Sequence, residues 1–304
     1  MLIKEEQIRK SLNFYVIDVG EGLMILIVFP DCTTMMYDCN IRDTDEDCII
    51  EQLQCLIPLR NGQQHIDIFV NSHRDADHLR GLKKVNEFFP IYRIWDSGQT
   101  GNSVNSSDYQ YYMRLRRTVG YDVPVPSFTP YLSIGGVDVY CLSSSEHIVW
   151  ENESDFITEA LKIQHTNGIV LSIRYGSSSI LLTGDSDWYA WKYYIVPQFV
   201  RSNLLENAIL IASHHGSRSF FTDESNPTID PLHNSDTTYL DALNYINPQV
   251  TLISCGEYSQ YHHPNEEAVK LYKNFTQDRR VYTTNTCGTF HGRLFHAGRW
   301  NVKW

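Results

Sequence analysis

The chain has 304 residues, of which 42% are hydrophobic and 20% are charged. This composition is typical of a globular protein with a sizeable core and excludes a disordered or fibrous chain. The formal charge of −11 argues against a protein that holds nucleic acid through a broad basic face. It does not exclude a nuclease, because bound divalent cations create a positive field of their own.

Several further classes are excluded by simple patterns. No window approaches about 18 uninterrupted apolar residues, so no membrane span is expected. The first ten residues carry charges of both signs and have no apolar core, so they do not resemble a secretory signal. A cytoplasmic protein is therefore expected. The seven cysteines form no C-x-x-C pair, so neither a disulfide framework nor a zinc knuckle is expected. Without repeats or Pro/Gly linkers, residues 1–304 are predicted to form a single domain.

Short apolar segments separated by turn residues dominate the first third of the chain. The predicted elements are strands at 13–20, 23–30 and 33–39, a helix at 45–59, a strand at 66–71, a helix at 81–89 and a strand at 91–98. Residues 99–128 interrupt this rhythm with a polar, Tyr-rich excursion. Its tyrosines and arginines suit either contacts with bases and phosphates or an amphipathic helix packed on the domain, and packing is the simpler interpretation.

The second half of the chain alternates strands with helices. The predicted elements are a hairpin over 168–186, a Trp-rich helix at 187–199, strands at 208–217 and 249–256, a helix at 265–275, and strands at 280–285 and 288–297. Many strands with helices between them in both halves predict an α+β fold. The expected architecture is a sandwich of two sheets covered by helices on the outside.

Histidines and aspartates gather where the predicted strands end. Asp38 ends the third strand, HRDADH (73–78) follows the strand at 66–71, and Asp185 ends the hairpin. His214 and His215 end the strand at 208–217, and His263 follows the strand at 249–256. Strand ends from two sheets can build one shared site, and imidazole with carboxylate suits zinc, manganese or iron.

Most of these signals have simpler interpretations when each is taken alone. TGD around Asp185 and HHGS around His214 are common turns, and HHP before a helix can be an N-terminal cap. HRDADH differs, because two imidazoles and two carboxylates on one tight turn would repel or compete for protons without a cation between them. The five signals together therefore favour a metal site over a solvated acidic turn.

The order of these motifs resembles the metallo-β-lactamase-fold hydrolases, whose signature is H-x-H-x-D-H after a buried strand. More narrowly, the chain looks like the branch formed by the hydrolase domain of the ComEC-type DNA-uptake channel and its stand-alone relatives. That branch has Asp in place of the second His, as in His73-Arg74-Asp75-Ala76-Asp77-His78. Further landmarks are DVGEG (18–22), LLTGD, SHHGS and YHHP, and the resemblance runs from about residue 13 to about 292. It implies the αββα sandwich of the metallo-β-lactamase fold.

The resemblance also implies a role for individual residues. His73 and Asp75 would hold one ion, and Asp77 and His78 the other. Asp185 would bridge the two ions, and His214 would be a further ligand later in the chain. Asp38 would orient the ligands. The catalytic candidates are Asp77, as ligand or general base, and His263, near the scissile group. Two divalent ions, zinc or manganese, are expected, and the carboxylate at Asp75 favours manganese. The family's separate middle histidine has no clear counterpart, since His165 is near but the match there is Asn167, so a one-ion site stays open.

Two bridged ions that activate a hydroxide serve in-line attack on phosphorus. The sequence therefore predicts a metal-dependent phosphodiesterase or nuclease acting on nucleic acid or nucleotides. Two alternatives stay open: a hydrolase of small phosphoesters or cyclic nucleotides, and a catalytically silent regulatory subunit of a multi-protein system. Stand-alone relatives of this branch often belong to bacterial multi-gene systems, including antiphage defence, so a protein partner or an oligomer is compatible with the resemblance.

Overall fold

The computed structural model describes residues 10–99, 104–144, 164–223, 237–257 and 262–304. Within these ranges the strands form two sheets. The eight-stranded sheet runs, from edge to edge, β15 (Trp300–Lys303), β14 (Phe290–Leu294), β1 (Leu12–Val16), β2 (Ile25–Val28), β3 (Thr34–Tyr37), β4 (Ile68–Asn71), β5 (Ile94–Asp96) and β6 (Tyr121–Asp122). The seven-stranded sheet runs β13 (Val281–Thr283), β12 (Val250–Ile253), β11 (Ile209–Ile211), β10 (Ser178–Leu182), β9 (Val170–Tyr175), β8 (Val137–Ser143) and β7 (Leu132–Ile134).

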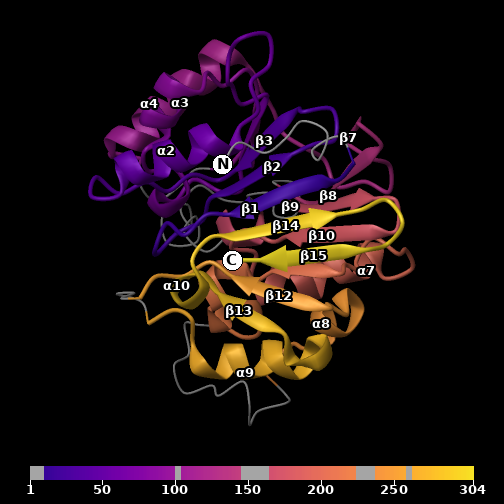
Figure 1. Ribbon diagram of the computed structural model, residues 1–304. Helices are drawn as coiled ribbons and strands as arrows, with labels where there is room; N and C mark the ends of the chain where they lie inside the picture. The colour runs from indigo at the N-terminus through magenta and orange to yellow at the C-terminus, as the bar shows by residue number, and fades with distance from the viewer. Residues whose placement is uncertain (1–9, 100–103, 145–163, 224–236, 258–261) are drawn as a thin grey trace.

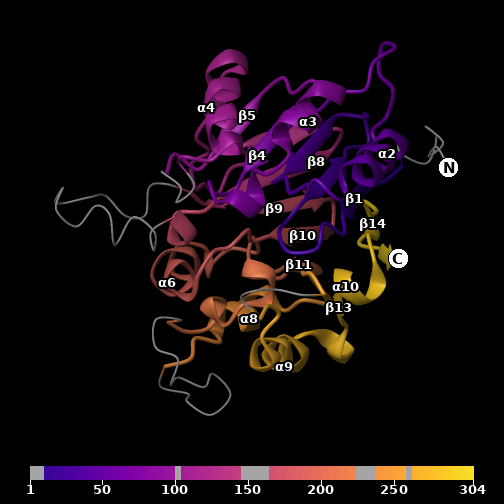
Figure 2. The same cartoon turned by 90° about the vertical axis from the view of Figure 1, so that its left-hand side faces the viewer.

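Helices cover the outer face of each sheet. The first sheet carries α2 (Glu46–Leu56), α3 (Leu82–Phe88) and α4 (Ser107–Val119). The second carries α6 (Trp188–Ala190), α7 (Val196–Phe199), α8 (Asp241–Ile246) and α9 (Glu266–Phe275), and α10 (Thr284–Cys287) is a short turn after β13. Figures 1 and 2 show the sheets lying between these two groups of helices. No helix in the described ranges combines the length and the hydropathy that crossing a bilayer requires.

Three apolar layers hold the sandwich together. Alternate residues of a strand point to opposite faces of a sheet, and β1 shows the consequence. Phe14 and Val16 join the layer between the sheets, together with Leu182 of β10, whereas Tyr15 faces the layer under α2 to α4. Leu181 belongs to the third layer, under the helices of the second sheet. Both sheets are therefore apolar on both faces, which explains why their strands read as nearly continuous apolar runs.

The direction of the strands determines at which edge of each sheet their C-terminal ends lie. β3, β4, β5 and β6 pair in parallel in the first sheet, as do β10, β11, β12 and β13 in the second. The C-terminal ends of parallel strands meet at one edge of a sheet, and ligands in such sheets bind beyond that edge. The segments that follow β3, β4, β10 and β11 are therefore brought together, and these are the segments that carry the candidate site residues.

The Tyr-rich excursion contains a packed helix. Its described part includes α4, whose first turn is capped by the Ser106 hydroxyl accepting from the Tyr109 amide (3.1 Å). Tyr109, Tyr112 and Leu115 are buried at helical spacing. The packing interpretation is therefore confirmed for α4, while residues 100–103 lie outside the described ranges.

Other predicted elements were wrong in detail. The helix expected at 187–199 is broken into α6, a π-helical turn η3 (Trp191–Ile195) and α7. Pro197 has no amide hydrogen, so a regular i→i−4 ladder cannot continue through it, and the wider π turn lies just before it. The sequence analysis also missed β7, β8, α8 and β15. Of these, β8 had a readable signal, because Val137, Val139 and Cys141 alternate as buried residues along it.

Candidate metal centre

The loop after β4 is held in a fixed shape by backbone contacts. The strand ends at Asn71, whose side-chain amide donates to the backbone carbonyl of His73 (2.6 Å). Asp75 then precedes a 3₁₀ turn, η1 (Ala76–His78). Gly22 lies against this turn with φ of +125°, and a Cβ there would come within 2.8 Å of the Asp77 carbonyl oxygen. The DVGEG landmark therefore has a steric role: it lets the backbone pass close behind the loop.

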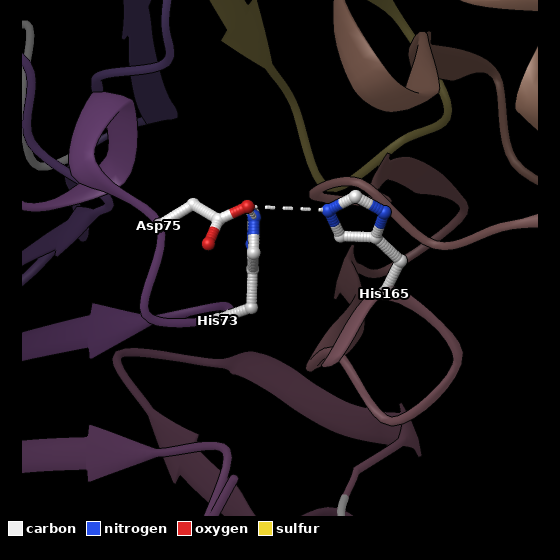
Figure 3. A group of neighbouring side chains, drawn as sticks. All are labelled: His73, Asp75 and His165. Carbon is white, nitrogen blue, oxygen red and sulfur yellow. Dashed lines mark hydrogen bonds and ion pairs between the residues drawn. The ribbon is translucent and has the colours of Figure 1, made fainter. Parts of the chain in front are cut away.

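His73, Asp75 and His165 converge in what we call the His165 half of the site. Asp75 Oδ2 lies 3.5 Å from His73 Nε2 and 3.4 Å from His165 Nε2. Figure 3 shows the three side chains turned toward one another. The neighbouring Gln164 donates to the same carboxylate oxygen (2.7 Å). The three ligand atoms of this half lie within 4.8 Å of one another, a spacing that could hold a metal ion. His165 was not among the residues predicted to bind metal.

A second group forms the His215 half. Asp77 Oδ2 lies 3.8 Å from His78 Nε2 and 3.3 Å from His215 Nε2. These three residues also place one ligand atom each within 4.8 Å of the others. His78 is fully buried, whereas the Asp77 side chain is 31% exposed. Asp77 is therefore the member of this half that solvent or a substrate can reach.

Asp185 lies between the two halves and faces each with a different oxygen. Oδ1 is 3.3 Å from His78 Nε2 and 3.9 Å from His215 Nε2. Oδ2 is 3.7 Å from His73 Nε2 and 3.5 Å from His214 Nε2. This is the arrangement a bridging carboxylate requires, with one oxygen available to each ion.

Hydrogen bonds behind the site fix the orientation of the imidazoles. His78 Nδ1 lies 2.7 Å from Asp38 Oδ2, and Asp38 also accepts from the Ser72 amide (2.7 Å) and hydroxyl (2.6 Å). His214 Nδ1 lies 2.9 Å from the Ser219 hydroxyl, and His215 Nδ1 lies 3.1 Å from the Ser254 carbonyl. With Nδ1 engaged outside, the Nε2 lone pair is directed into the site, as in protein metal centres generally.

The backbone after β11 directs adjacent histidines to different halves. His214 and His215 have φ of 48° and 54°, in the left-handed region that non-glycine residues rarely adopt. Their Nε2 atoms consequently face Asp185 Oδ2 and Asp77 Oδ2, respectively. Strain of this kind concentrates at functional sites.

The donor set fits divalent cations. Several buried polar atoms of the site make no hydrogen bond within the described structure. Four of them lie against other candidate ligands: His73 Nε2, His78 Nε2, His215 Nε2 and Asp185 Oδ1. Buried polar groups are normally paired, so this concentration indicates a bound species. Imidazole nitrogen with carboxylate oxygen is the ligand set of zinc, manganese and iron sites.

Titration behaviour agrees with that conclusion. Burial alone would lower the pKa of His78, but the carboxylates of Asp185, Asp38 and Asp77 outweigh it and raise the pKa well above its ordinary value. Burial is likewise outweighed at His165, where the bond to Asp75 and the charge of Asp185 raise the pKa to about 9. At His214 burial prevails over Asp185, and the neighbouring histidines lower the pKa further. The carboxylates thus favour positive charge on His78 and His165, and metal binding there would displace the protons.

All six residues predicted to bind metal lie in this cluster: His73, Asp75, Asp77, His78, Asp185 and His214. The proximity is shown, while metal binding itself stays a prediction. The two catalytic candidates are also placed here, since Asp77 belongs to the His215 half and the His263 ring lies 5.0 Å from that of His214.

His165 and His215 were not predicted as ligands. His165 was set aside because the match to the expected pattern is Asn167, and only His214 of the two histidines in HHGS was chosen. A usable signal was present for both, because each lies on a segment next to a predicted strand end. His165 lies beside Asp75, where the middle histidine of the expected ligand set had no clear counterpart in the sequence.

Comparisons with known proteins bear on the fold. No protein-family model matches the sequence, and no curated protein matches it either. Among solved structures, the chain is similar to CmlA, a diiron β-hydroxylase from Streptomyces venezuelae, with a TM-score of 0.50 and 12% identity. The match covers 94% of this chain and 54% of that protein, so this chain spans about half the length of its structural relative.

Two further structures are more distant. Igni18, a metallo hydrolase from Ignicoccus hospitalis, matches with a TM-score of 0.44 and 12% identity over 96% of this chain and 99% of its own. A protein from Thermotoga maritima described as a zinc-dependent hydrolase of the metallo-β-lactamase superfamily matches with a TM-score of 0.39 and 12% identity. That match covers 89% of this chain and 97% of the other protein. The two sheets with helices on their outer faces confirm the predicted α+β class and αββα sandwich.

Proposed function

We propose that this protein is a metal-dependent hydrolase of phosphodiesters, with nucleotides or nucleic acid as substrates. The observation that carries the proposal is Asp185, which offers one oxygen to each of two groups of buried ligand atoms. Ions held this way supply Lewis acidity: they make water nucleophilic at neutral pH and offset negative charge on a phosphoryl group. The ligands would be His73, Asp75 and His165 on one side and Asp77, His78 and His215 on the other, with His214 beside Asp185.

The accessible residues supply the proton transfers. The partly exposed Asp77 carboxylate is the group in the cluster best placed to accept a proton from water entering the site. The His263 ring lies against those of His214 and His215, with centroids 5.0 Å and 6.4 Å away. From there an imidazole can donate a proton to a departing oxygen.

An aromatic surface next to the site favours substrates that contain bases. Tyr189 is 38% and Tyr193 is 48% exposed, and their ring centroids lie 4.6 Å apart. Lys192 Nζ lies 5.3 Å from the Tyr193 ring centroid and 5.6 Å from that of Trp188. Stacking on exposed rings stabilises single-stranded nucleic acid by about 1–3 kcal/mol per base, and a nearby lysine suits the phosphates.

This surface is tied to the metal cluster by short links. Trp188 follows Asp185 by three residues, a chain reach of at most about 11 Å. Asp187 caps α6 by accepting from the Ala190 amide (2.9 Å) and also accepts from the Thr166 hydroxyl (2.8 Å). Since Thr166 follows His165 directly, the aromatic helix is anchored to the segment that carries a candidate ligand.

The test is hydrolysis by protein loaded with manganese or zinc. The substrates are bis(p-nitrophenyl) phosphate, single-stranded DNA, single-stranded RNA and a cyclic dinucleotide. Asp185→Asn should abolish turnover on every substrate, and Asp278→Asn, at a 72% exposed carboxylate, should not. Loaded wild-type protein that cleaves none of these substrates contradicts the proposal.

Substrate choice has its own test. Tyr189→Ala combined with Tyr193→Ala should raise KM for single-stranded DNA at least about fivefold, as loss of about 1 kcal/mol of stacking implies. Turnover of the small diester should be unchanged, because it is too short to reach the aromatic surface. Tyr245→Ala on α8, at a 42% exposed ring, is the matched control. Equal KM values in wild type and double variant would exclude this surface as a base-binding site.

A further inference from the structure

Arg74 separates two candidate ligands in the sequence but points away from the site. It lies between His73 and Asp75, whose side chains face one another in Figure 3. Arg74 is only 4% exposed, and its guanidinium makes a forked contact with Asp96 at the end of β5. Nε donates to Asp96 Oδ2 (3.2 Å) and NH2 donates to Oδ1 (2.6 Å).

Asp96 is the centre of a larger buried network. The carboxylate is fully buried and also accepts from the Gly98 amide (2.6 Å) and from the Tyr112 hydroxyl. Arg116 NH1 forms a further ion pair with Oδ1 at 3.0 Å. Tyr112 and Arg116 both belong to α4, the helix of the Tyr-rich excursion. A single carboxylate therefore joins the metal loop, the end of β5 and α4.

The position of Arg74 restricts the orientation of the two neighbouring side chains. His73 Nε2 and Asp75 Oδ2 lie 3.5 Å apart, whereas the Arg74 side chain between them in sequence turns to Asp96, with Nη2 2.6 Å from Oδ1. Anchoring Arg74 on one side therefore sets the direction of His73 and Asp75 on the other. The fork adds orientation that a point charge lacks, because two parallel bonds prevent rotation about either one.

Arg74 and Asp96 remain charged, because removing the charge from either group would leave the other charge buried and unpaired. Arg74 is buried, and its charge is offset by the Asp96 carboxylate at hydrogen-bond distance. Burial opposes ionisation of Asp96, and Arg74, Tyr112 and Arg116 together lower its pKa. A buried arginine left without its carboxylate would be strongly destabilising.

We propose that Arg74 is a positioning residue of the metal centre: through Asp96 it holds His73 and Asp75 in ligand geometry and makes that geometry depend on α4. The inference rests on the proposed function only in that the His165 half binds metal, and it requires no particular substrate. Residues in this supporting role typically change metal affinity by about 10- to 100-fold.

The experiment compares Arg74→Met and Arg74→Lys with Arg93→Met. Arg93 makes the same kind of fork, to Asp122, but is 60% exposed and lies away from the metal loop. Metal affinity is measured by competition with a chromophoric chelator, site geometry by the visible spectrum of the cobalt-loaded protein, and stability by thermal unfolding of metal-free protein. Arg74→Met should weaken binding of one ion about 10- to 100-fold and alter the cobalt spectrum. Arg74→Lys should recover part of the loss, and Arg93→Met should stay within twofold of wild type.

The inference would be overturned by an Arg74→Met protein that unfolds at a lower temperature but keeps wild-type metal affinity and cobalt spectrum. That result would show a purely structural ion pair. If Arg74→Met does not fold, Tyr112→Phe replaces it, because it removes one hydroxyl from Asp96 and leaves both charges. A small but measurable loss of affinity, about two- to fivefold, supports the network, and unchanged affinity contradicts it. Wild type that binds metal without cleaving phosphodiesters would refute the proposed function and leave this inference testable.

Discussion

Replacing Asp38 by Asn should weaken metal binding while leaving the fold intact. The fully buried carboxylate accepts from the Ser72 amide and hydroxyl and contacts His78 Nδ1 at 2.7 Å. For His78 Nε2 to bind metal, Nδ1 must carry the hydrogen and donate it. An asparagine keeps the shape and one acceptor oxygen. In place of Oδ1 its NH2 group would face the Ser72 amide, and in place of Oδ2 it would face both the Ser72 hydroxyl and the His78 N–H.

The size of the effect follows from the bond that is lost. A hydrogen bond to a charged group contributes about 1.5–3 kcal/mol. Since about 1.4 kcal/mol corresponds to a tenfold change in an equilibrium constant, the dissociation constant of the ion held by His78 should rise about 10- to 100-fold. The other ion should be affected less, because Asp38 contacts His78 directly and reaches His73 through Ser72.

Competition titration with a chelator, at fixed pH and with both ions resolved, measures this change. The matched control is Asp67→Asn, because Asp67 accepts from the Thr34 amide (2.8 Å) and hydroxyl (3.1 Å) and lies 3.2 Å from His65 Nε2. It reproduces the Asp38 pattern near the start of β4, away from the metal loop. Equal affinities in wild type and Asp38→Asn would refute the orienting role, and so would an equal loss in the control.

Four further predictions follow from the same geometry. Asp185→Asn should lower the metal content measured by elemental analysis from two ions per chain to one; retention of two would show that it does not bridge. Asp75→His should move the metal optimum of activity from manganese towards zinc, and identical metal series would place Asp75 outside the ligand set. His165→Ala and His215→Ala should each remove a different ion, which distinct cobalt spectra of the two variants would show and identical spectra would contradict. Burial and nearby positive charges lower the His291 pKa from 6.5 to about 4. The neutral imidazole is therefore favoured in the folded protein and adds about 1 kcal/mol, after screening, to the free energy of unfolding. This contribution is complete above pH 6.5 and is lost as the pH falls to about 4. His291→Gln should flatten urea midpoints across that window, and an unchanged slope would contradict the assignment.

Much of the candidate site was readable from the chain. HRDADH after an apolar strand, Asp185 after another and His214 after a third all proved to lie in one cluster. The physical reason is general: apolar runs become buried strands, and the ends of parallel strands meet at the same edge. Asp38 was likewise predicted as an orienting residue, and its contact with His78 has the geometry that role requires.

The division of ligands between the halves was not readable in the same way. His165 belongs to a segment whose sequence match pointed to Asn167, and only its 3.4 Å approach to Asp75 identifies it. The two histidines of HHGS are adjacent in sequence, but positive φ angles direct them to different carboxylates. Nothing in local propensity predicts such angles for histidine, because they are sustained by packing from elsewhere in the fold.

The sequence by itself determined the two-sheet, helix-covered architecture and the strand ends at which ionisable residues collect, because burial patterns and turn residues are local properties. The position of Arg74, which turns away from its neighbours to meet Asp96 beside α4, could be seen only in the folded structure. The tertiary structure also decided which oxygen of Asp185 faces which histidine. These features depend on contacts between segments far apart in the chain, and such contacts exist only once the two sheets have packed together.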